Sequence, residues 1–253
     1  MLSKVKDSIF IAKLFDSHMV RVFNKILVYI NMELLYDNLL EEHKYLGILN
    51  EVQIQFVVGC VVGGLKYLRN KKIIHGDLKL ENLLFDERDY VKIADFGMSH
   101  YYTGWQPGKL GTYGYLAPEL ISNKVTEGFV TIHFWQKYFY NSDYFALGVC
   151  LQRLSRSYSI VRAEKRHGKI FRKIKIPVGI SPELSSFIEK LCRKSPHSRI
   201  GYKSINELLK DPFMASLSLD DLKDYKKKSK NKKRKGKRRK KKNRKSKKMA
   251  TNE

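Results

Sequence analysis

The stretch between residues 73 and 97 holds side chains that can serve phosphoryl transfer. It reads IIHGDLKLENLLFD and, after a short gap, KIADFG. Phosphoryl transfer needs a carboxylate that orients the nucleophile, a cation beside the moving phosphate and oxygen ligands for magnesium. Asp77 can supply the carboxylate, Lys79 the cation, and Asn82 with Asp95 a pair of oxygen ligands. Each group alone is usually a turn former or a solvated charge, so the ordered set carries the signal.

Five segments of the chain resemble the motifs of the eukaryotic protein kinase family, in the family's order. They span most of residues 9–214, which makes the resemblance highly specific. It implies a kinase-like fold, ATP and Mg²⁺ as cofactors, and a protein as substrate. HGDLKLEN (75–82) resembles the catalytic loop, ADFG (94–97) the magnesium-binding loop, GTYGYLAPE (111–119) the end of the activation segment, DYFALG (143–148) the anchoring helix and PHSRIG (196–201) the closing motif.

The resemblance implies a role for each residue around the acceptor. Asp77 would orient the substrate hydroxyl and accept its proton, and Thr112 would hydrogen-bond both Asp77 and Lys79. Magnesium would bind through Asn82 and Asp95. Lys79 stands in the DLKxEN form that is typical of serine/threonine kinases, so the expected acceptor is a protein Ser or Thr.

The resemblance also implies three structural contacts. Asp143 would hold the backbone of the catalytic loop, and Arg199 would form a buried ion pair with Glu119. Leu14, His75 and Phe96 would belong to a stacked apolar spine. Glu81 favours substrates with basic residues near the acceptor, with a solvated surface glutamate as the equal alternative.

The segment INMELL, which ends at Leu35, resembles the gatekeeper and hinge that bind adenine. Met32, Glu33 and Leu35 are the residues that would do so. Leu84 would pack beneath the adenine, although an ordinary core leucine is an equal reading from the residue alone. Asp37 could reach the ribose across a linker that is shorter than usual in the family.

The family's glycine-rich loop, strand lysine and helix glutamate all lie upstream of the hinge, and no glycine-rich phosphate loop occurs in this sequence. Two hypotheses follow. The chain is a truncated part of a complete kinase, or it is a non-catalytic pseudokinase or scaffold. We favour truncation, because a degenerating remnant is not expected to keep the acidic, basic and amide residues of the site together.

Gly76 stands where the family usually has an arginine that clamps a phosphate on the activation loop. Hydroxyl groups between Gly97 and Gly111 are few, and none lies close to Gly111, where the family usually carries its phosphorylation site. We therefore expect activity that does not need phosphorylation of this loop. The hydroxyls are those of Ser99, Tyr101, Tyr102 and Thr103.

Hydrophobic patterning predicts an α+β architecture, mostly a helical C-terminal lobe with a partial β N-terminal lobe. Ser181 followed by Pro182 predicts a capped helix start. The glycines of the Glu51–Asn70 segment could allow another helix to approach closely. Predicted strands are Ile9–Phe15, Ile26–Leu35, Ile73–Ile74, Leu83–Phe85 and Val91–Ala94, and predicted helices are Glu51–Asn70, Tyr144–Leu154, Pro182–Arg193 and Ser204–Lys210.

Three regions are expected along the chain. Residues 1–36 would form a remnant of the small lobe and the hinge, residues 37–214 the large lobe, and residues 215–253 a basic disordered tail. The large lobe carries an aromatic-rich insertion at about 124–141. This insertion is either a docking element or sequence foreign to the mature protein.

The formal net charge of +25 is concentrated at the C-terminal end, where 18 of residues 226–248 are Lys or Arg and none is acidic. Self-repulsion predicts disorder there. The tail is interpreted first as a nuclear import signal, then as a solvated end or a binder of nucleic acid or other polyanions. It lacks aromatic residues, so such binding would depend on phosphate charge.

Three widely spaced cysteines argue against a disulfide scaffold or zinc site and favour a reducing compartment. The longest apolar run, residues 56–65, is too short to span a bilayer, so no transmembrane segment is expected. The expected location is cytoplasmic or nuclear.

Overall fold

A computed structural model of the chain describes residues 5, 8–101, 111–122, 139–166 and 176–215. The described residues all belong to one compact unit that covers residues 1–216. Nearly all of the predicted insertion and tail lies outside the described residues, as do Tyr102 and Thr103. Among the helices within these ranges, none is long and apolar enough to cross a membrane.

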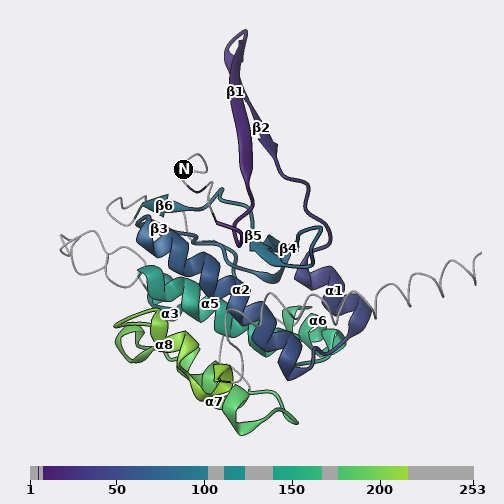
Figure 1. The fold of residues 1–253 in the computed structure, drawn as a ribbon, viewed down its shortest axis with the longest axis vertical. Helices are drawn as coiled ribbons and strands as arrows, with labels where there is room; N and C mark the ends of the chain where they lie inside the picture. Colours follow the sequence, from purple (N-terminus) through teal and green to yellow (C-terminus); the bar gives the residue numbers. More distant parts are fainter. Residues whose placement is uncertain (1–4, 6–7, 102–110, 123–138, 167–175, 216–253) are drawn as a thin grey trace, which may run out of the picture. The chain divides into compact units, whose positions relative to one another are not determined.

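The chain begins with an exposed antiparallel hairpin, formed by strands β1 (Leu14–Val22) and β2 (Lys25–Met32) (Figure 1). The predicted strand over residues 9–15 is wrong in position, because only its last two residues belong to β1. The earlier residues instead contact strand β5 (Val91–Ile93): the amide of Ala12 donates to the Ile93 carbonyl (2.9 Å). This contact with β5 accompanies the burial of Ile11 and Ala12 in the middle of the apolar run, whereas Ile9 stays exposed.

Helix α2 (Glu51–Asn70) is the long central helix, with the bounds that the sequence predicts. Its start is fixed by a capping box, in which Asn50 and Gln53 each accept the other's backbone N–H. Gly63 and Gly64 do allow a close approach, but not by another helix. A Cβ at Gly63 would lie 2.6 Å from the ring of Phe10, and one at Gly64 would lie 2.8 Å from Ile93.

Two small antiparallel sheets flank the 75–82 loop. Strand β3 (Ile73–Ile74) pairs with β6 (His100–Tyr101), and β4 (Leu83–Phe85) pairs with β5. The loop thus leaves one sheet and enters the other through the 3-10 helix Leu80–Asn82. Both ends of the loop are therefore held by strand pairing.

The remaining elements of the described chain are helices. Helix α5 begins five residues before the predicted start, whereas α7 and α8 are shorter than predicted. Helices α1, α3 and α6 were not predicted. The elements are α1 (Leu39–Leu46), α3 (Pro118–Ser122), α5 (Phe139–Leu154), α6 (Tyr158–Arg166), α7 (Pro182–Leu191), α8 (Asn206–Leu209) and the 3-10 helices Pro196–Ser198 and Pro212–Met214.

The N-terminal cap of α7 agrees with the sequence. Ser181 accepts the amide of Leu184, and Pro182 occupies the first turn. The predicted α+β architecture with a mostly helical C-terminal part is confirmed. Its core consists of α2 and α5 with the strands that carry the loop: Val58, Val61, Leu147 and Leu151 are almost completely buried.

Candidate active site

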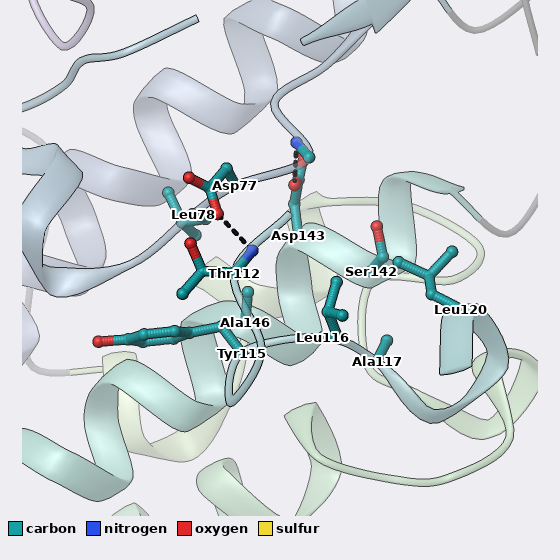
Figure 2. A pocket seen from close by; sticks show the side chains of 11 residues that line it. Asp77, Leu78, Thr112, Tyr115, Leu116, Ala117, Leu120, Ser142, Asp143 and Ala146 are labelled. Atoms are coloured by element: carbon teal, nitrogen blue, oxygen red, sulfur yellow. Dashed lines mark hydrogen bonds between the residues drawn. The ribbon is translucent and has the colours of Figure 1, made fainter. Parts of the chain in front are cut away.

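The 75–82 loop is anchored to α5 by one buried carboxylate. The amide of His75 donates to Oδ2 of Asp143 (2.9 Å), and the amide of Gly76 donates to Oδ1 (3.0 Å). Burial raises the pKa of the Asp143 carboxyl, and these two N–H bonds oppose the rise. Figure 2 shows Asp143 bonded to the loop from its place on α5. The contact expected of Asp143 is therefore present.

Asp77 lies at the centre of a three-residue network with Lys79 and Thr112, of which Figure 2 shows Asp77 and Thr112. The Nζ of Lys79 donates to Oδ2 of Asp77 (2.7 Å) and to Oγ1 of Thr112 (2.8 Å), and the amide of Thr112 donates to Oδ1 of Asp77 (2.7 Å). Burial alone would raise the pKa of the Asp77 carboxyl, but the bonds from Lys79 and Thr112 outweigh it and hold the pKa below its usual value. The carboxylate is thus ionised and fixed in orientation.

Asn82 and Asp95 come from two segments joined by a backbone bond. The amide of Ala94 donates to the Asn82 carbonyl (2.9 Å), which places the residue before Asp95 directly against Asn82. The Nδ2 of Asn82 donates to the carbonyl of Asp77 (2.9 Å), so its Oδ1 faces away from Asp77. Asp95 is exposed, has φ +58° and accepts the amide of Gly97 at Oδ1 (3.1 Å). A left-handed non-glycine residue is strained, and such strain clusters at functional sites.

An amide oxygen and a carboxylate fit magnesium, which binds few protein oxygens and completes its shell with water and phosphate oxygens. A pair of ligands is enough for that role, and the described residues contain no cluster of three or more His, Cys, Asp or Glu side chains that could hold a metal alone.

His75 connects the loop to the segment that carries Asp95. Its Nδ1 accepts the amide of Asp77 (3.3 Å). Its Nε2 faces the carbonyl of Ala94 (2.9 Å) and therefore carries the hydrogen of that bond. Its ring meets Phe96 edge to face, with the centroids 5.2 Å apart. Leu14, the third residue expected in the spine, is buried.

The segment after Gly111 is held by side chains from both neighbouring elements. The hydroxyl of Tyr115 donates to Oε2 of Glu81 (3.1 Å), so this glutamate has a partner within the protein. Arg153, at the end of α5, donates to the Gly114 carbonyl (3.1 Å) and stacks over the Tyr115 ring at 3.9 Å. Arg153 was not predicted, since nothing local in the sequence marks its partner 39 residues away.

Arg199 and Glu119 form the expected buried ion pair. The guanidinium donates to both carboxylate oxygens (2.7 and 3.0 Å), and the arginine side chain is fully buried. Arg199 also donates to the carbonyls of Asn141 and Arg193 (2.8 Å each). This pair attaches the end of the 111–119 segment to the C-terminal helices.

Gly76 and Gly111 touch through their backbones. Both have positive φ (+78° and +76°), and a Cβ at Gly111 would lie 2.3 Å from the Gly76 carbonyl oxygen. A Cβ at Gly76 would lie 3.0 Å from the carbonyl oxygen of Met98. Positive φ favours glycine at both positions, and at Gly111 the space also requires it.

The predicted hinge runs beside β4. The amide of Tyr36 donates to the Phe85 carbonyl (2.8 Å), the amide of Phe85 donates to the Asp37 carbonyl (3.2 Å), and Asn38 forms a bridge with Leu84. The structure thus brings Leu84 to the segment that contains Leu35 and Asp37. Met32 ends β2.

The side chain of Glu33 is not available to adenine, because its carboxylate is bonded to other residues of the protein. The Nζ of Lys92 lies 2.7 and 2.6 Å from its two oxygens, and the amide of Lys13 donates to Oε1 (2.6 Å). Only the backbone of Glu33 could face a nucleotide. The pairing with Lys92 was missed, and the one sequence signal was a lysine inside a strand whose other residues are apolar.

Comparison with known proteins agrees with this geometry. The chain is 29% identical over 181 residues to beta-adrenergic receptor kinase 1 of Rattus norvegicus, an alignment that covers 68% of this chain and 25% of the relative. It is 33% identical over 183 residues to cGMP-dependent protein kinase, isozyme 1, of Drosophila melanogaster, covering 66% and 22%. The chain spans about a quarter of the length of these relatives. The family described as protein kinase domain matches residues 1–214, so the chain belongs to the protein kinase family.

Proposed function

We propose that the chain transfers the γ-phosphoryl group of ATP to serine or threonine residues of a protein. The observation that carries this proposal is the network in which Lys79 and Thr112 fix the Asp77 carboxylate. Asp77 accepts the proton of the acceptor hydroxyl and orients its oxygen. Lys79, whose Nζ bonds Asp77, offsets negative charge on the phosphoryl group as it is transferred.

Asn82 and Asp95 are the proposed magnesium ligands. Magnesium, when bound there, neutralises charge on the phosphate oxygens. The bond from Asn82 to the Asp77 carbonyl and the bond from the Ala94 amide to the Asn82 carbonyl connect both segments to the loop of the proposed base. Adenine would lie between the hinge residues Met32, Glu33 and Leu35 and the floor at Leu84, with Asp37 toward the ribose.

A small pocket lies beside Asp77. It is bounded by the catalytic loop, the segment 112–120 and the start of α5, and Leu78, Leu116 and Ala146 contribute apolar side chains (Figure 2). Its free space is about that of one water molecule, so we assign it no part of a peptide substrate.

The outer regions complete the proposal. Residues 1–36 would supply small-lobe strands and hinge, and residues 37–214 the large lobe. The Lys/Arg-rich residues 226–248 would serve first as a nuclear import signal, with binding of nucleic acid or other polyanions by charge as the alternative role.

The second candidate is a non-catalytic pseudokinase or scaffold, which would keep the fold and the site residues without transferring phosphate. The full chain incubated with γ-labelled ATP, Mg²⁺ and a mixture of Ser-, Thr- and Tyr-containing peptides separates the two. We expect label on Ser and Thr peptides. ATP binding by calorimetry without any label on peptide would favour the second candidate, and label on Tyr peptides alone would overturn the acceptor assignment.

A further inference from the structure

Lys92 is a buried charge in a strand that is otherwise apolar. It lies in the middle of β5, its side chain is 6% exposed, and its neighbours Val91 and Ile93 are fully buried. Burying an ammonium group is costly unless a well-placed counter-charge compensates it. Glu33 provides that charge, with distances of 2.6 and 2.7 Å from Nζ to its two oxygens.

The Glu33 carboxylate is also fixed on its other side. The amide of Lys13 donates to Oε1 (2.6 Å), and the amide of Glu33 donates back to the Lys13 carbonyl (2.9 Å). Glu33 is therefore held by two segments at once, and its backbone cannot shift without breaking a buried ion pair. Because Glu33 lies in the proposed hinge, this ion pair fixes the hinge peptide.

The other partner, Lys92, belongs to the element that leads to the proposed metal ligand. Lys92 is paired with Leu84 across the β4–β5 ladder, and Asp95 follows three residues later. On its other edge, β5 accepts a hydrogen bond at the Ile93 carbonyl from the amide of Ala12. Hinge, adenine floor and Asp95 are thus connected through one ion pair.

We propose that Lys92 is a positioning residue for nucleotide binding: through Glu33 it sets where the hinge backbone lies relative to Leu84 and Asp95. This inference rests on the proposed ATP-binding function. Lys92 does not contact the nucleotide itself. Its ion pair fixes the hinge, at the adenine end of the proposed site, relative to Asp95, at the phosphate end.

The test compares Lys92→Met with Lys190→Met in the full chain. Lys190 forms an ion pair of similar length with Asp211 (2.7 Å), far along the chain among the C-terminal helices, and it serves as the control for a purely structural pair. Adenosine and MgATP are titrated by calorimetry at a temperature at which thermal melting shows each variant folded.

We expect Lys92→Met to raise the Kd for adenosine about tenfold, and the Kd for MgATP at least as much. Lys190→Met should lower Tm without changing either Kd. Lys92→Arg, which keeps a cation, should restore most of the affinity. If Lys92→Met does not fold, Glu33→Gln is measured instead, because its amide oxygen can still accept the Lys13 N–H; the expected rise in Kd is the same.

The double variant Lys92→Met/Glu33→Gln adds a second readout. Because both residues act through one contact, the Kd of the double variant should not exceed the higher of the two Kd values of the single variants. Unchanged adenosine affinity in folded Lys92→Met, or strictly additive losses in the double variant, would overturn the positioning role while leaving the proposed function standing. A wild-type chain that binds neither adenosine nor MgATP would overturn both.

Discussion

At the scale of single residues, the pKa of each aspartate in the site depends on its burial and on the groups that bond to it. Asp77 is buried enough for its carboxyl to resist ionisation, yet Lys79 and Thr112 reverse that effect. Asp143 shows the opposite balance, since burial exceeds the effect of its N–H donors. Two aspartates of one site therefore differ in pKa because of their partners.

Lys79→Met should move the acidic limb of the pH–rate profile to higher pH. The variant removes the bond and the charge that lower the pKa of Asp77, whereas burial, which raises that pKa, remains. The carboxylate would then become protonated, and unable to accept a proton, at a higher pH than in the wild type. The measurement is kcat/KM for peptide across pH. Lys44→Met, which removes an exposed pair with Glu41, is the control and should leave the limb in place; an unmoved limb in Lys79→Met would contradict the assignment.

At the scale of secondary-structure elements, the closing motif acts as a buried connection. Arg199 joins the 111–119 segment to the helices that follow it, through Glu119 and through the carbonyls of Asn141 and Arg193. Removing one member of such a pair leaves the other charge buried without compensation.

Arg199→Met should therefore lower the free energy of unfolding by about 3–5 kcal/mol, measured in urea. Glu119→Gln should cost less, because a neutral amide can still accept one bond from Arg199. A loss below about 1 kcal/mol for Arg199→Met would be a surface-like value and would contradict the buried pairing.

The sequence predicted elements well where local signals are complete. The bounds of α2 were predicted from its length and apolar face, with its start fixed by a capping box, and the start of α7 was predicted from Ser181 and Pro182. Helix α1 was missed although Asn38 caps it by accepting the Glu41 amide, because eight residues, half of them polar, give little periodicity. The start of β1 was misplaced because contacts with β5 bury the preceding apolar residues.

The same distinction between local and distant signals holds for the contacts of the site. The contacts of Asp77 with Thr112, of Asp143 with the loop and of Arg199 with Glu119 agree with the expectations drawn from motif resemblance; the catalytic roles remain predictions. The Glu33–Lys92 pair spans 59 positions and has no local signature, so only the fold reveals it. Arg153 was missed for the same reason.

At the scale of the whole molecule, charge is divided between a mildly basic body and a strongly basic end. Residues 1–225 carry 32 basic and 24 acidic residues, whereas residues 226–248 carry 18 basic and no acidic ones. The body holds the proposed site, and the end offers charge alone.

Deleting residues 226–248 should abolish most retention on heparin or RNA at low salt. With the tail present, binding should weaken steeply as salt rises, since displaced counterions drive it. Affinity measured across a salt series, with and without the tail, tests this. Equal retention after deletion would assign polyanion binding to the body instead.

The central claim, that Asp77 is the base of a phosphoryl transfer, is tested most directly by Asp77→Asn in the full chain. Transfer of label from γ-labelled ATP to Ser/Thr peptides should fall by about 10²–10⁴-fold, while MgATP affinity stays near the wild-type value. Asp16→Asn, on the exposed hairpin, should transfer label normally. Equal transfer by Asp77→Asn and wild type, or no transfer by wild type despite MgATP binding, would contradict the account.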